Sequence, residues 1–79
     1  MTKNNTINFE IVKHYGVLSE KQSPKSVWKK ELNLVKWNDG DAKFDIREWD
    51  ENHERMSKGI VLTEDEFRQL AVIISEMQR

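Results

Sequence analysis

The 79-residue chain contains no cysteine, which excludes disulfide bridges and metal sites built on thiolates. A domain of this length buries a limited share of its surface and commonly needs a supplement to its own core. With disulfides and thiolate-bound metals excluded, oligomerisation is the expected supplement. The absence of cysteine also fits a reducing compartment.

Long apolar runs are missing as well. The first residues, Met-Thr-Lys-Asn-Asn-Thr, are polar and no apolar stretch follows them, so no signal peptide is recognisable. No segment approaches the roughly 20 apolar residues that a membrane-spanning helix needs. We therefore expect a cytoplasmic protein without a membrane partner. It should have a flexible N-terminus at residues 1–6 and one domain over residues 7–79.

The chain also lacks an excess of one charge, because its formal net charge is −1. The charges are unevenly distributed: residues 1–36 hold seven lysines and three acids, whereas residues 37–57 hold three basic and seven acidic residues. A small net charge argues against a general basic nucleic-acid binder, but a dipolar chain can still carry one basic face. Composition alone therefore leaves the ligand open.

Residue patterns typical of enzymes and metal sites are absent too. The sequence has no Gly-rich phosphate loop and no serine in a nucleophile elbow, and Asp39, Asp41 and Asp45 do not follow the calcium-loop pattern. His14 and His53 have no partner at metal-ligand spacing and are interpreted as surface histidines. We expect neither catalysis nor a bound metal or cofactor.

The apolar pattern predicts an α+β fold, a four-stranded antiparallel meander followed by one C-terminal helix (β-β-β-β-α). A polar connection at residues 19–26 and a tight turn at residues 38–41 separate the first three strands. A capping box that starts at Thr63 opens the helix. The predicted strands span residues 7–18, 27–37, 42–49 and 55–62.

Alternation along the strands divides the side chains between two faces of the sheet. The apolar positions are Ile7, Phe9, Ile11, Tyr15, Val17, Trp28, Leu32, Leu34, Ala42, Phe44 and Ile46. The other face is expected to be open to solvent and to carry Lys29, Asn33, Trp37, Lys43, Arg47 and Trp49. The helix should cover the apolar face. Its own apolar surface is wider than the ~100° stripe that one sheet contact needs, which favours a second contact with another chain.

An open sheet face with aromatic and basic side chains suits single-stranded nucleic acid. An aromatic ring can stack on any base, worth about 1–3 kcal/mol each, and nearby Lys and Arg neutralise phosphates. The residues alone also allow packing tryptophans, edge-protecting lysines and cross-strand charge pairs. The candidate stacking residues are Trp37 and Trp49, and the candidate phosphate contacts are Lys13, Lys29, Lys30, Lys43, Arg47 and Lys58.

The order of motifs in the second half of the chain resembles the DNA-binding domain of the positive cofactor 4 family of transcriptional coactivators. The resemblance covers roughly residues 30–77. Over its whole length the chain is similar to the bacterial YdbC group, which has the same single-stranded-DNA-binding fold. The shared motifs are Trp37, Gly40, Asp45-Ile46-Arg47-Glu48-Trp49, Lys58-Gly59-Ile60-Val61-Leu62 and Phe67.

The resemblance implies a homodimer that packs through its helices and binds single-stranded DNA, with RNA as an alternative ligand. Trp37 stands at the position of a stacking aromatic residue, Arg47 at that of a backbone-contacting arginine, and Lys58 at that of the lysine before Gly-Ile. The expected interface residues of the helix are Phe67, Leu70, Ile73, Ile74 and Met77.

The chain departs from the family pattern in its turn, where Asn38, Asp39 and Asp41 replace basic residues, and at Asp50, where the family has a second aromatic residue. The main prediction is a largely sequence-independent binder of single strands that acts in transcription, replication or repair, with proteins of those processes as further partners. The alternative is a protein-interaction module that uses the same open face, which the acidic middle segment favours.

Overall fold

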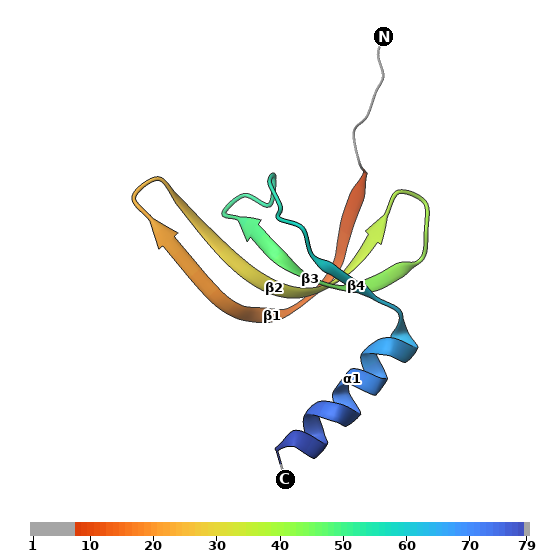
Figure 1. Cartoon of the computed structure of the whole chain (residues 1–79). Coiled ribbons are helices and arrows are strands. Elements are labelled where there is room, and N and C mark those ends of the chain that lie inside the picture. Colours follow the sequence, from red (N-terminus) through yellow and green to blue (C-terminus); the bar gives the residue numbers. More distant parts are fainter. Residues whose placement is uncertain (1–7, 79) are drawn as a thin grey trace.

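A computed structural model describes residues 8–78 of the chain (Figure 1). Each strand pairs antiparallel with the next one along the chain, which gives the sheet order β1-β2-β3-β4. This confirms the predicted meander with a C-terminal helix. The predicted flexible segment 1–6 and the strand position of Ile7 lie outside the described residues. The elements are β1 Phe9–Ser23, β2 Ser26–Trp37, β3 Ala42–Asp50, β4 Ile60–Leu62 and α1 Glu64–Met77.

β1 is longer than predicted, because most of the expected connection at residues 19–26 is strand. Pairing with β2 continues to Ser23 opposite Ser26, which leaves Pro24 and Lys25 in the turn. The β1 side chains of residues 19–23 are all polar and exposed, on both faces of the sheet. The backbone ladder does not require apolar side chains, so the sequence pattern missed this part of the strand.

β1 also contains three register shifts within Ile11–Ser19. Each such bulge adds one residue to one strand and reverses the alternation of its side chains. The prediction that Tyr15 shares a face with Ile11 and Val17 is therefore wrong. The Tyr15 ring lies 5.8 Å from that of Phe44 on the helix side of the sheet, whereas His14 is paired with Asn33 on the other side.

β4 is shorter than predicted, because the chain enters the ladder only after Gly59, at Ile60. Before this glycine only Met56 pairs with β3, as an isolated bridge to Trp49. A Cβ atom on Gly59 would lie 2.5 Å from the Cβ atom of Arg47, so this close approach of two backbones requires glycine. The chain consequently passes over the edge of β3 directly beside Arg47.

The helix begins as predicted but does not cover the sheet. In the capping box, the Thr63 hydroxyl accepts a hydrogen bond from the Glu66 backbone N–H at 3.1 Å, and the Glu66 carboxylate accepts one from the Thr63 N–H at 2.8 Å. Phe67 then stacks on Phe44 with ring centroids 4.0 Å apart. The later turns project away from the sheet (Figure 1), and no described residue of α1 is buried. The helix also lacks the length and apolar character needed to cross a membrane.

The sheet is strongly curved, and the helix leaves from its convex side (Figure 1). Residues directly opposite in the ladder share a face, so the pairing assigns the side chains. The convex face carries Lys13, Tyr15, Trp28, Lys30, Leu32, Leu34, Phe44, Ile46 and Glu48. The concave face carries Phe9, Ile11, His14, Lys29, Glu31, Asn33, Val35, Trp37, Lys43, Asp45, Arg47 and Trp49.

The core of the chain lies on the face that was expected to be open. Side chains on the concave side of a curved sheet converge and cover one another, whereas the helix leaves most of the convex side uncovered. The apolar convex residues, including Leu32, Leu34 and Ile46, are only half-buried as a result. The fully buried side chains, all on the concave face, are Val35, Trp49, Asn33 and Asp45.

Candidate nucleic-acid interface

Three aromatic rings form the centre of the concave face. The Phe9 ring lies 5.8 Å from that of Trp37 and 5.2 Å from that of Trp49. Trp49 has 0 % of its surface exposed and also packs against His53, with ring centroids 5.4 Å apart. The expectation of an exposed ring at Trp49 is therefore wrong. Trp37, at the end of β2, is half-buried and remains accessible from solvent.

Arg47 holds Trp37 from the β3 side, and its own donors are already engaged. Its Nε and Nη2 atoms donate to the two carboxylate oxygens of Asp45, each at 2.7 Å, and Nη1 lies 3.4 Å from both Met56 Sδ and the Ser57 carbonyl oxygen. The guanidinium carbon lies 4.6 Å from the centroid of the Trp37 ring. This geometry makes Arg47 a positioning residue for Trp37, because its charge is compensated by Asp45.

The structure brings two of the predicted lysines to the concave face. Lys43 stands opposite Val35 and is exposed, and Lys29 stands opposite Trp49 and is half-buried. Lys58 lies at the edge of β3, where it lines a hollow of about 410 Å³ together with Arg47. Lys30, Ile46 and Glu48 of the convex face line the same hollow, so Lys58 stands between the two faces of the sheet.

Two other predicted phosphate contacts lie on the wrong face for this purpose. Lys30 stands opposite Glu48, and Lys13 stands opposite Leu34 with its amine 5.1 Å from the centroid of the Tyr15 ring, so both belong to the convex face. Lys30 follows Lys29 directly and must point to the other side of the strand. A run of two lysines could not put both on one face.

Two histidines that the sequence did not connect belong to one hydrogen-bonded chain on the concave face. His14 Nδ1 lies 2.7 Å from Asn33 Oδ1, and Asn33 Nδ2 donates to Glu31 Oε1 at 3.0 Å. His53 Nε2 lies 3.1 Å from each carboxylate oxygen of Glu31. These residues line a hollow of about 330 Å³. Both histidines lie at the surface, as predicted, but the hydrogen bonds that connect them were not predicted from the sequence.

The central carboxylate of this chain is buried but ionised. Burial raises the pKa of Glu31, but hydrogen bonds from Asn33 and His53, together with the charges of His53 and His14, outweigh that effect and hold the pKa below its ordinary value of 4.5. Among residues 8–78, no group of three or more His, Cys, Asp or Glu side chains is arranged to hold a metal ion.

The turn after β3 delivers His53 in a backbone conformation that non-glycine residues seldom adopt. Its φ angle is 57°. The turn is fixed by Asp50, whose carboxylate accepts hydrogen bonds from the backbone N–H groups of Glu54 at 2.8 Å and Arg55 at 3.0 Å. The hydrogen bond from Arg55 is the main reason that the pKa of Asp50 lies below its ordinary value. The turn thus holds the imidazole against Glu31.

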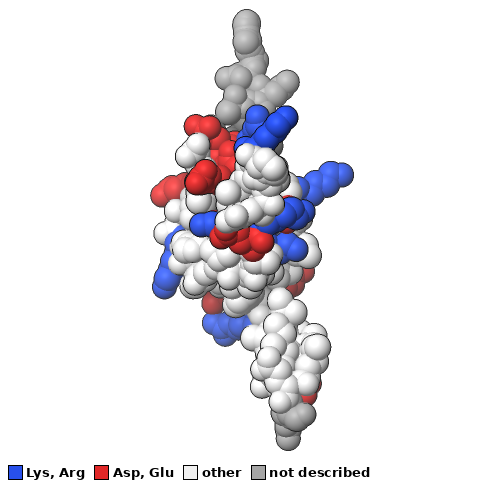
Figure 2. Space-filling model, turned by 90° about the vertical axis from the view of Figure 1, so that its left-hand side faces the viewer, with Lys and Arg blue, Asp and Glu red and all other residues white. Residues whose placement is uncertain are grey.

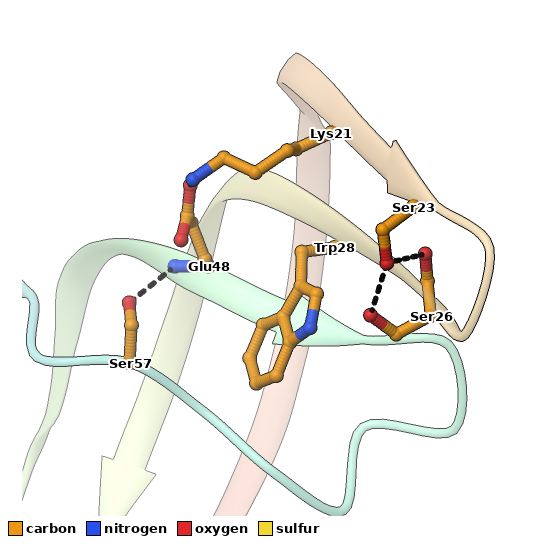
Figure 3. Close-up of a pocket in the computed structure, with 6 residues that line it drawn as sticks. All are labelled: Lys21, Ser23, Ser26, Trp28, Glu48 and Ser57. Atoms are coloured by element: carbon orange, nitrogen blue, oxygen red, sulfur yellow. Dashed lines mark hydrogen bonds and ion pairs between the residues drawn. The ribbon is translucent and has the colours of Figure 1, made fainter.

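A separate hollow of about 360 Å³ lies at the hairpin end of the convex face (Figure 3). Trp28, which was expected in the core, is half-buried and lines it. Lys21 Nζ approaches a carboxylate oxygen of Glu48 at 3.8 Å, and the Ser57 hydroxyl accepts a hydrogen bond from the Glu48 backbone N–H. This hollow is on the opposite face from Trp37 and is not part of the same surface.

Charged side chains of both signs are interleaved over the sheet, and no single basic patch dominates the view in Figure 2. The visible surface of the helix is mostly free of basic and acidic residues. The exposed apolar residues of its later turns are Val72, Ile73, Ile74 and Met77.

An accessible aromatic ring beside amines on the concave face of a sheet is the kind of surface on which single-stranded nucleic acid can stack. Sequence comparison agrees with this interpretation. Residues 25–73 match the family described as Transcriptional Coactivator p15 (PC4), so the chain belongs to that family. Membership supports a single-stranded-DNA-binding, coactivator-like role and confirms the predicted family resemblance.

An uncharacterized protein of Treponema pallidum (strain Nichols) is 31% identical over 74 residues, which cover 94% of this chain and 84% of the relative. The match therefore includes β1, which precedes the part that the family comparison covers.

Proposed function

We propose that this chain is a dimeric, cytoplasmic binding protein, without catalytic activity, that holds single-stranded DNA on its concave face largely independently of sequence. Bases stack on Trp37, and the amines of Lys29, Lys43 and Lys58 contact phosphates. RNA is the alternative ligand. The observation that carries the proposal is the accessible Trp37 ring, held by Arg47 in the concave face of a chain from the PC4 family.

The first prediction concerns Trp37. The Trp37→Ala variant should bind oligo-dT roughly 5-fold to 150-fold more weakly, because one stacked base is worth about 1–3 kcal/mol. Binding is measured by the fluorescence anisotropy of labelled oligo-dT at two salt concentrations, with a duplex of matched length as a comparison, because the variant lacks the tryptophan whose quenching would report stacking. Higher salt should weaken binding, because released counterions drive part of it.

Trp28→Ala is the matched control for this experiment, since Trp28 is also half-buried but lies on the convex face. It should leave the affinity unchanged. Equal affinities of all three proteins would contradict the stacking role. An absence of binding to any oligonucleotide would favour the protein-interaction module.

The second prediction concerns the dimer. The part of α1 that projects from the sheet exposes Ile73, Ile74 and Met77, and the sheet leaves its convex apolar residues half-buried. A second copy of the chain would cover both surfaces. Ile74→Lys should therefore weaken self-association by about 2 kcal/mol, which is roughly 30-fold. Sedimentation equilibrium measures this.

Ser75→Lys is the control, because it adds the same charge one position away, outside the apolar surface of the helix. It should leave self-association unchanged. A wild-type protein that sediments as a monomer at all concentrations would contradict the dimer.

A further inference from the structure

The hydrogen bonds of the His14–Asn33–Glu31–His53 chain have only one consistent direction. The ionised Glu31 carboxylate can only accept hydrogen bonds, so the Asn33 amide must turn its Nδ2 group towards it, as the 3.0 Å contact shows. The Asn33 oxygen then faces His14 and can only accept from Nδ1 at 2.7 Å. His53 Nε2 must likewise donate to Glu31.

This direction determines what the two rings can offer to a ligand. A neutral imidazole has one N–H group, and in both rings that group is used within the chain. His14 Nε2 and His53 Nδ1, which receive no hydrogen bond from residues 8–78, therefore carry a lone pair. Phosphate oxygens are acceptors, so they can bind these nitrogens only after each ring takes up a second proton.

The charge of the concave face also favours phosphate binding by protonated histidines. At the ladder positions of this face, Lys29, Lys43 and Arg47 are matched in number by Glu31, Asp45 and Glu20, which stands opposite Lys29. The strands therefore add no net charge to this face while both histidines are neutral, and Lys58 stands at its edge outside this count. The titratable and charged groups around the two rings are Glu20, Lys29, Glu31, Asp45, Arg47, Asp50, Glu54 and Arg55.

We propose that His14 and His53 are proton-dependent phosphate contacts of the concave face, so that the protein takes up protons when it binds single-stranded DNA. This inference rests on the proposed function. The two side chains are accessible, with 50% of His14 and 40% of His53 exposed, while Glu31 beneath them is 4% exposed. The left-handed backbone conformation of His53 places its ring within hydrogen-bond distance of Glu31, which this role requires.

The low pKa of Glu31 supports the geometry, since the carboxylate stays an acceptor throughout the range in which imidazoles titrate. Affinity should consequently rise as the pH falls, because the protonated rings are the form that binds. We expect affinity for oligo-dT to increase at least about fivefold from pH 8 to pH 6, because histidine is the side chain that commonly changes its charge in this range.

The test measures oligo-dT affinity against pH at constant ionic strength, since thymine gains no proton in this range. The variants are His14→Asn and His53→Gln, alone and combined, because their amide nitrogens can replace the inward-facing Nδ1 and Nε2 donors but cannot take up a proton. Calorimetry in two buffers that differ in ionisation enthalpy counts the protons directly. The wild type should take up protons on binding, and the double variant should take up fewer and show a flatter pH profile.

Lys29→Gln is the control, because it removes a fixed positive charge from the same hollow. It should weaken binding at every pH and keep the slope. Oligo-dT binding that is independent of pH, or a double variant with the wild-type slope and proton uptake, would overturn this inference alone. An absence of binding at any pH would overturn it together with the proposed function.

Discussion

Replacing Trp49 by alanine is expected to lower the free energy of unfolding by about 3–5 kcal/mol, the usual cost of removing a large aromatic side chain from a packed core. Trp49 is fully buried, contacts Phe9 and His53, and bridges to Met56. Its loss would leave a cavity where β3, β1 and the following turn meet. In a domain of this size such a loss is a large fraction of the total stability.

The measurement is urea unfolding followed by far-ultraviolet circular dichroism. All proteins are compared at one concentration, because self-association would add to the apparent stability. Trp28→Ala is the matched control and should cost about 1–2 kcal/mol, since a half-buried ring loses less transfer free energy. If Trp49→Ala were as stable as the wild type but bound oligo-dT poorly, the exposed ring expected from the sequence would be the correct description.

The second large effect is expected for Asp45→Ala, which should cost about 3–5 kcal/mol, because it leaves a nearly buried guanidinium without its partner. Asp45 has 0 % of its surface exposed and holds Arg47 through two hydrogen bonds of 2.7 Å. The loss should also release Arg47 from the Trp37 ring, so the Trp37 emission should shift. Urea unfolding and fluorescence spectra measure the two effects.

The Glu64–Arg68 pair of α1 is the control for Asp45. It is almost as short, with its nitrogen and oxygen atoms 2.8 Å apart, but both side chains are exposed. Glu64→Ala should therefore cost only about 0.5 kcal/mol or less. Replacing Asp45 by leucine and Arg47 by methionine together should recover much of the stability, because no unpaired charge is left. Equal costs for Asp45→Ala and Glu64→Ala would contradict the structural role of the Asp45–Arg47 pair.

The sequence predicted well those features that depend on local chemistry. The capping box at Thr63, the turn before Ala42 and the shared face of Lys43, Arg47 and Trp49 follow from residue type and from the two-residue period of a strand. Each of these needs only neighbouring residues. The family resemblance was recognisable for the same reason, since its motifs are short and ordered along the chain.

The sequence predicted poorly which face of the sheet would be buried and which side chains would contact one another on that face. Alternation shows that Trp37 and Trp49 share a face, but not that curvature encloses one ring and leaves the other accessible. The bulges that put Phe9 and Ile11 on the same face as His14 leave no mark in the apolar pattern. His53 reaches Glu31 only because a turn far along the chain adopts a left-handed conformation.

The bulges of β1 have a consequence for solubility. β1 is an edge of the sheet, is 15 residues long, and faces solvent along one side of its backbone. A flat edge of that length would offer a continuous row of hydrogen-bonding groups to any other extended chain. Three register shifts break that row into short pieces, so a second molecule cannot add a strand along it without breaking register. The opposite edge, β4, is only three residues long. The register shifts thus make edge-to-edge pairing through β1 unfavourable.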